Sequence, residues 1–252
     1  MAKSETPVTD RLNEKHKEIK VKKVLVTLAA VGMLCALPGC NNRSDEQTVN
    51  KGQETALQPM QQSWRGVLPC ADCEGIETSL FLEKDGTWVM NEHYQGVERE
   101  PSSFASYGTW ARTAEKLVLT DTKGEKSYYR AKGDKLEMLD REGNPIVSSL
   151  NYTLEPVKTS LPVTPMAMRG MYFYMADAAT FTDCATGKRV SVANNAQLER
   201  GYAAARGNES KPVLLTVEAH FTLQANPDTG EKVTTLVADK SSHFDAKKTC
   251  KE

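Results

Sequence analysis

Alternating apolar and polar positions dominate the chain from about residue 63 to residue 155. The stretch 76–82 places an apolar or β-branched side chain at every second position, apart from the extra Phe81, and Lys84-Asp85-Gly86 then supplies a hairpin turn. The same pattern predicts further strands over 64–68, 88–90, 104–110, 116–120, 126–131, 135–140 and 146–154. About eight antiparallel strands without a helix favour a closed up-and-down barrel, because closure removes exposed edges. A barrel of this size either holds one small ligand or is filled by side chains, and the pattern leaves both open.

A second β-rich region follows a proline-rich segment, 156–165, which we expect to be a fairly stiff linker. In the region 166–252, strands are predicted over 169–176, 190–193 and 212–224, and one helix over Ala196–Arg206. Asn194-Asn195 is suited to cap this helix and Gly207 to end it. Strands, one helix and strands again predict a small barrel resembling the OB-fold. The predicted fold class is therefore mainly β, with an N-terminal barrel domain over 63–155 and a C-terminal OB-like domain over 166–252.

The strongest apolar run of the chain lies near its N-terminus, at Val24–Leu37, behind a cluster of lysines. These 14 residues are too few for a transmembrane helix, which takes about 20. A basic start, a short apolar stretch and small Gly39 before Cys40 resemble a bacterial lipoprotein signal, in which the cysteine thiol receives diacylglycerol. We therefore expect residues 1–39 to be the signal region and Cys40 to carry a lipid; an ordinary secreted protein with a free Cys40 is the alternative. Residues 1–20 are polar and mixed in charge, so we expect the natural start near Val21.

The polar stretch 40–62 has no hydrophobic period and is interpreted as a flexible tether behind the lipid. Asn41 is not the aspartate that retains enteric lipoproteins in the inner membrane, so an outer-membrane location is expected, facing the periplasm or the cell surface. A formal net charge of −1 provides no electrostatic footprint for nucleic acid. A mean hydropathy of −0.50 with one apolar run excludes a multi-span membrane protein.

Of the six cysteines, Cys35 lies in the signal region and Cys40 is assigned to the lipid, which leaves four in an exported protein that meets oxidising surroundings. They are Cys70, Cys73, Cys184 and Cys250, which allow three pairings. We favour one bond within each domain, Cys184–Cys250 and Cys70–Cys73. The long loop is worth about 4 kcal/mol in the chain-entropy model and the short one about 2 kcal/mol, which gives Cys184–Cys250 the structural role.

The Cys70-Ala71-Asp72-Cys73 segment is the most chemically loaded part of the sequence. Two thiols at this spacing suit Cu(I) or a redox-active dithiol, and a plain disulfide is the simpler interpretation; all three stay open here. Oxidoreductase catalysis is rejected, because that chemistry needs the pair at a helix start, whereas here it lies between strands. Met166, Met168, Met171 and Met175 are soft ligands too, but they border an aromatic strand and are interpreted as core packing. No nucleophile motif, phosphate loop or acid–base pair is found, so we predict that the protein is not an enzyme.

The segment Ser63-Trp-Arg-Gly-Val-Leu-Pro-Cys-Ala-Asp-Cys-Glu-Gly-Ile-Glu-Thr78 resembles the signature of the NlpE (CutF) lipoproteins of enteric bacteria. The resemblance continues through Tyr107-Gly-Thr-Trp110 and Arg169-Gly-Met-Tyr-Phe-Tyr-Met-Ala-Asp-Ala-Ala-Thr-Phe-Thr-Asp-Cys184 to the end of the chain. It implies an outer-membrane lipoprotein with a lipocalin-like barrel and an OB-fold domain. The implied role is to activate the Cpx envelope-stress pathway through the sensor kinase CpxA, during surface contact or lipoprotein mislocalisation, with a link to copper tolerance.

The resemblance also carries over individual residues: Cys70 and Cys73 become the motif of the first domain, and Cys184–Cys250 the disulfide of the second. No cofactor is required on this interpretation, and Cu(I) is the candidate ligand. The alternative function is a copper-binding or small-ligand-binding lipocalin-like periplasmic carrier without a signalling role. A redox enzyme is the third hypothesis, which would require turnover of a dithiol substrate.

Overall fold

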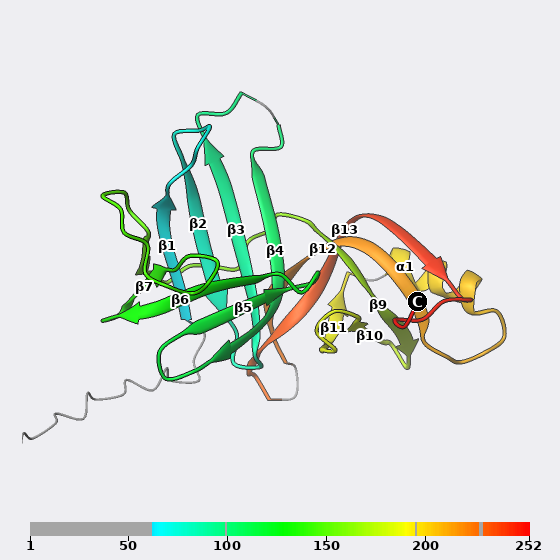
Figure 1. The fold of residues 1–252 in the computed structure, drawn as a ribbon. Coiled ribbons are helices and arrows are strands. Elements are labelled where there is room, and N and C mark those ends of the chain that lie inside the picture. Colours follow the sequence, from blue (N-terminus) through cyan, green and yellow to red (C-terminus); the bar gives the residue numbers. More distant parts are fainter. Residues whose placement is uncertain (1–61, 99, 195, 227–228) are drawn as a thin grey trace, which may run out of the picture. The chain divides into compact units, whose positions relative to one another are not determined.

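Eight antiparallel strands close into a barrel in the first folded region of the computed structural model, which describes residues 62–252 apart from 99, 195 and 227–228 (Figure 1). The strands, each hydrogen-bonded to its neighbour along the chain, are β1 (Gln62–Leu68), β2 (Gly75–Leu82), β3 (Thr87–Gln95), β4 (Ser103–Arg112), β5 (Leu117–Asp121), β6 (Lys126–Lys132), β7 (Lys135–Met138) and β8 (Thr153–Pro156). β8 closes the barrel by pairing with β1 at Trp64–Pro156 and Arg65–Glu155. The predicted up-and-down barrel is confirmed.

Alternation along the strands sends one set of side chains into the barrel, where they form its core. The members with the lowest exposure include Leu80, Leu119, Tyr129, Leu136 and Leu154. Trp88 connects β4 to β5 from within the barrel, because its indole N–H donates hydrogen bonds to the carbonyls of Thr109 and Thr120, at 3.1 and 3.2 Å. Gly108 is needed at this place, since a Cβ atom there would lie 1.9 Å from the Thr120 carbonyl oxygen.

The predicted turn between the second and third strands is built as the sequence indicates. Gly86 adopts φ +87°, a left-handed conformation that glycine takes without a Cβ penalty. The Asp85 carboxylate accepts hydrogen bonds from the Thr87 backbone N–H at 2.9 Å and from its hydroxyl at 2.6 Å. This local bonding fixes the register of β2 against β3, and hence which face of β3 points into the barrel.

A second closed barrel contains β9 (Met166–Met175), β10 (Ala178–Asp183), β11 (Arg189–Ala193), β12 (Val213–Ala225) and β13 (Lys232–Asp245). Its strand order is β10-β11-β13-β12-β9, with β11 parallel to β13 and all other pairs antiparallel. The helix α1 (Ala196–Arg206) connects β11 to β12. A five-stranded barrel with its helix after the third strand has the arrangement of an OB-fold, as predicted.

The helix of the second barrel has the bounds that the sequence predicts. Leu198 and Tyr202 are its buried residues, and the Tyr202 hydroxyl donates to the Lys211 carbonyl at 2.8 Å. Gly207 takes φ +62°, the left-handed conformation that ends many helices. Asn194, one half of the predicted cap, also has a positive φ of 51°.

The strand predicted over 146–154 is wrong for most of its length. The chain makes an isolated bridge between Leu139 and Pro145, and the regular strand β8 begins only at Thr153. The polar residues in between bind backbone groups locally: the Leu150 N–H donates to the Ser148 hydroxyl at 3.1 Å, and the Thr153 N–H donates to the Asn151 side-chain oxygen at 3.1 Å. Such local bonds compete with a strand ladder.

The sequence analysis does not predict strands β10 and β13. It also predicts the whole segment 156–165 as linker, which is wrong at two positions. In the structure Pro156 ends β8, and Leu161 is 9% exposed and packs into an apolar core with residues of the second barrel such as Met166 and Tyr172. No helix within the described part of the chain is long and apolar enough to cross a membrane.

Candidate functional site

The Cys70–Cys73 pair lies on the turn that connects β1 to β2, where both cysteines are half-buried and the two residues between them are exposed. The structure joins the two sulfurs as a disulfide, with a Cα–Cα distance of 5.3 Å. The turn is held at its base, where the Glu74 backbone N–H donates to the Gln95 carbonyl at 3.1 Å. Gly75 is also required here, because a Cβ atom would lie 2.5 Å from the Val67 side chain. The pair therefore sits on a rigid hairpin rather than at the start of a helix.

This setting limits the chemistry of the two sulfurs. A disulfide cannot ligate copper, so a metal site requires the reduced pair, which would offer two thiolates to a soft ion such as Cu(I). Among the described residues, no group of three or more His, Cys, Asp or Glu side chains is arranged to hold a metal ion. The residues present therefore fit a two-sulfur Cu(I) site, and they do not fit a three- or four-ligand site of those side chains.

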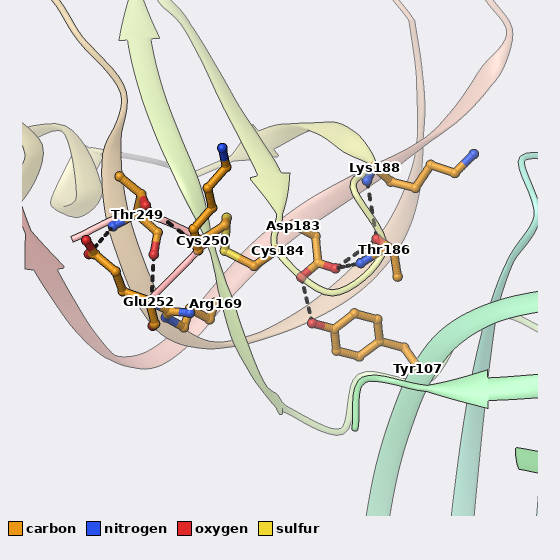
Figure 2. Close-up of a disulfide and its surroundings, with 10 residues drawn as sticks. Tyr107, Arg169, Asp183, Cys184, Thr186, Lys188, Thr249, Cys250 and Glu252 are labelled. Carbon is orange, nitrogen blue, oxygen red and sulfur yellow. Dashed lines mark hydrogen bonds between the residues drawn. A yellow bond between two sulfur atoms is a disulfide. The ribbon is translucent and has the colours of Figure 1, made fainter. Parts of the chain in front are cut away.

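The second disulfide, Cys184–Cys250, ties the C-terminal segment to the end of β10 (Figure 2). The Cys184 backbone N–H donates to the Arg169 carbonyl at 2.9 Å, which connects the cysteine to β9. The Arg169 guanidinium in turn donates to the carbonyls of Thr249 and Glu252, both at 2.8 Å. One cation and one covalent bond thus hold the last residues of the chain on the second barrel.

A buried hydrogen bond that no sequence pattern predicts lies directly beside this disulfide. Asp183, 3% exposed, accepts a hydrogen bond from the Tyr107 hydroxyl of β4 at 2.7 Å (Figure 2). Its other carboxylate oxygen accepts from the Thr186 backbone N–H at 2.7 Å and from the Thr186 hydroxyl at 2.8 Å. Burial, and then the charge of Asp183, raise the pKa of Tyr107 far above its usual value.

Tyr107 also packs edge-on against Phe221 of β12, with ring centroids 5.6 Å apart. It thus gives the first barrel a polar and an aromatic contact with the second. In the sequence, Tyr107 and Asp183 could have been singled out only because both lie inside the NlpE-like motifs. They are 76 residues apart, so no local pattern shows that they meet.

The four methionines considered as soft ligands do not gather at one place. Met166 and Met168 are 3% and 2% exposed in the core, whereas Met175, on the opposite face of β9, is 59% exposed. Two of the histidines have ordinary partners: His93 bonds Ser103 at 2.9 Å, and His220 bonds Asp239 at 2.9 Å. This arrangement supports the packing interpretation of the buried methionines.

Comparison with known protein families identifies both barrels. The model of the NlpE N-terminal domain matches residues 64–149, and that of the NlpE C-terminal OB domain matches residues 162–251. Together they match well over half of the chain. The chain belongs to the NlpE family. The lipoprotein NlpE of Escherichia coli K12 is 70% identical over 230 residues, which are 91% of this chain and 98% of that protein.

A solved member of the NlpE family is the Cpx pathway activator NlpE from Escherichia coli, known from a crystal structure. It is 73% identical, covering 77% of this chain and all of that chain, with a TM-score of 0.38. The relationship to this family therefore rests on sequence identity. The predicted lipidation site, Cys40, the signal region and the tether through residue 61 lie outside the described residues.

Proposed function

We propose that this chain is an outer-membrane lipoprotein, anchored through Cys40, which reports envelope stress or surface contact to the sensor kinase CpxA and so activates the Cpx pathway. The observation that carries the proposal is 70% identity to a lipoprotein over nearly its entire length, together with the description of a 73% identical relative as a Cpx pathway activator. Two closed barrels behind a polar tether provide a folded module that a partner can contact. No catalytic step is assigned to the chain.

The test is expression of the full chain in a bacterium that lacks its own NlpE and carries a Cpx-responsive reporter. We expect induction of several-fold on overexpression, and loss of that induction when the gene for CpxA is deleted. The matched control is a chain truncated after residue 61, which keeps the lipid and the tether without the barrels and is expressed at the same level. A silent reporter at verified protein levels would refute the signalling role, and induction that persists without CpxA would refute the proposed partner.

A second proposal is that the reduced Cys70–Cys73 pair binds one Cu(I) ion and links the protein to copper homeostasis. The observation that supports this proposal is that both cysteines lie on one short surface hairpin, with the Cα atoms of Cys70 and Cys73 5.3 Å apart. Thiolate is the ligand that best selects Cu(I). When bound, the metal would have the thiolates of Cys70 and Cys73 as its two ligands and would need no further protein group.

The copper proposal is tested by titrating Cu(I) into the reduced full chain against a chromophoric chelator, under anaerobic conditions. We expect one equivalent to bind in the wild type and in Cys184→Ser/Cys250→Ser, and none in Cys70→Ser/Cys73→Ser. The two double variants are matched, because each removes one cysteine pair. Equal binding by all three proteins would show that the hairpin is not the site.

A further inference from the structure

A cavity of about 620 Å³ opens from the solvent into the first barrel, and its lining includes both core residues and exposed residues such as Lys126 and Arg141. This volume lies within the range of small-molecule sites in proteins, roughly 300–1,000 Å³. Apolar side chains from three strands line it: Trp88 and Met90 from β3, Leu119 from β5 and Met138 from β7. Glu92 of β3 lines the same cavity beside these apolar side chains, and polar or charged residues such as Ser106, Asp121 and Arg141 line the rest of it.

Glu92 is in this position because of the alternation of β3. Trp88 and Met90, four and two residues earlier, are 4% and 8% exposed in the barrel core, so Glu92 follows them on the inward face. Among the described residues, no side chain gives the Glu92 carboxyl a hydrogen bond or an ion pair. An inward carboxyl without a partner is costly to bury, and natural proteins rarely retain one without a role.

The electrostatics of the interior agree with this geometry. Burial raises the pKa of Glu92 above its usual value. Tyr129, 1% exposed in the core, has its pKa raised first by burial and then by the charge of Glu92. The Tyr129 hydroxyl, like Glu92, makes no hydrogen bond to any residue that the structure describes. Two polar groups inside the barrel are thus unmatched by the protein.

The other charged residues lining the cavity are engaged elsewhere or exposed. The Asp121 carboxylate accepts the N–H groups of Lys123 and Glu125, both at 2.8 Å, and thereby forms the β5–β6 turn. Asp140 caps its own turn in the same way, accepting the Asn144 N–H at 2.6 Å. Glu125, Lys126 and Arg141 are exposed, and within the described structure neither cation pairs with Glu92.

We propose that this cavity binds a small organic cation, a primary ammonium on an apolar body, with Glu92 as its counter-ion. The ammonium would neutralise the half-buried carboxylate, and the apolar body would cover Met90, Leu119 and Met138. The indole of Trp88 offers an aromatic surface to the same cation. The inference goes beyond the signalling and copper proposals, and it depends on neither.

Three probes of similar size separate charge from shape: benzylammonium, benzyl alcohol and benzoate. Each is titrated calorimetrically into the lipidated full chain in nanodiscs, with empty nanodiscs subtracted. We expect benzylammonium to bind at least tenfold more tightly than the alcohol and benzoate. The affinity of Glu92→Gln for benzylammonium should be at least tenfold lower than that of the wild type. Glu115→Gln, which changes an exposed residue of the same barrel, should leave this affinity unchanged.

Nuclear magnetic resonance provides a second measurement, because the Trp88 indole N–H lies at the cavity wall. We expect benzylammonium to shift this signal in the wild type and not in Glu92→Gln, whose circular dichroism should match the wild type. No binding of benzylammonium, equal affinity for benzyl alcohol, or undiminished affinity in Glu92→Gln would each overturn the proposal.

Discussion

At the scale of single residues, the contact between Tyr107 and Asp183 joins two parts of the chain that are 76 positions apart. The carboxylate is 3% exposed and accepts three hydrogen bonds, two from Thr186 and one from Tyr107. A buried charge is tolerated only when its acceptor sites are used. Tyr107 therefore stabilises the fold in two ways. Its hydroxyl donates to the buried carboxylate of Asp183, and its ring packs against Phe221.

Replacing Tyr107 by Phe tests this contribution, because it removes the hydroxyl and keeps the ring. We expect the free energy of unfolding to fall by about 1.5–3 kcal/mol, the usual value of a hydrogen bond to a charged group. Urea denaturation followed by tryptophan fluorescence measures the change. Tyr152→Phe is the matched control and should cost little, since the described structure shows no hydrogen bond from its hydroxyl.

The pH dependence of this variant follows from the raised pKa of Tyr107. The native state keeps its proton above the unfolded pKa of 10.0, so the stabilisation is complete below pH 10 and is lost as the pH rises further. At pH 10.5 the gap between wild type and Tyr107→Phe should therefore narrow by about 1 kcal/mol relative to pH 8. A constant gap would show that the hydroxyl does not stay protonated in the folded protein.

At the scale of elements, the Cys184–Cys250 bond holds a C-terminal segment that has little regular structure of its own. The segment after β13 is attached to the barrel by this bond and by two hydrogen bonds from Arg169. A disulfide with a sequence separation of 66 removes about 4 kcal/mol of chain entropy from the unfolded state. The Cys70–Cys73 bond, with a separation of 3, removes only about 2 kcal/mol.

Substituting both members of each pair by Ser should therefore give different results. In Cys184→Ser/Cys250→Ser we expect the C-terminal barrel to unfold at lower urea concentration and to be cleaved by protease near residues 246–252. In Cys70→Ser/Cys73→Ser we expect a protease pattern close to that of the wild type. Limited proteolysis with mass spectrometry measures both, and equal resistance of the two variants would contradict the structural role of the longer loop.

The elements also show what the sequence predicts and where it stops. Helix α1 is predicted to the residue, because Gly207 marks its end and Leu198 and Tyr202 mark its buried face. Strand β13 is missed, because the Lys, Asp and Ser residues along it hide the alternation. Residues 146–152 are mistaken for strand, because Ser148 and Asn151 satisfy the backbone from side chains, which a hydropathy pattern does not report.

The same distinction applies to the candidate sites. The Cys70–Cys73 hairpin is visible in the sequence because its residues are neighbours. The Tyr107–Asp183 contact and the unpaired carboxyl of Glu92 are not, because each depends on strands that meet only after the barrels close. Local chemistry can be predicted from spacing, whereas chemistry made by distant strands needs the fold.

At the scale of the whole molecule, the compartment of the protein decides the state of its cysteines. Disulfides form and persist in the cell envelope and are rare in the reducing cytoplasm. The described residues contain two disulfides, and export through the proposed signal region would place both barrels where they can form. Lipid anchoring and disulfide formation are therefore separate consequences of export, and one substitution at Cys40 distinguishes them.

Cys40→Ser should abolish labelling by radioactive palmitate and leave export through the apolar run intact. We expect the variant to be recovered without the lipid, with all four remaining cysteines still oxidised, because the oxidising compartment rather than the lipid supplies the disulfides. Thiol alkylation followed by mass spectrometry reads their state. Changing Cys35 to Ser is the matched control, since bulky Leu34 precedes it, and should leave labelling unchanged. Undiminished labelling of Cys40→Ser would place the lipid elsewhere, and a reduced Cys184–Cys250 pair in the wild type would remove the envelope location on which the proposed signalling function depends.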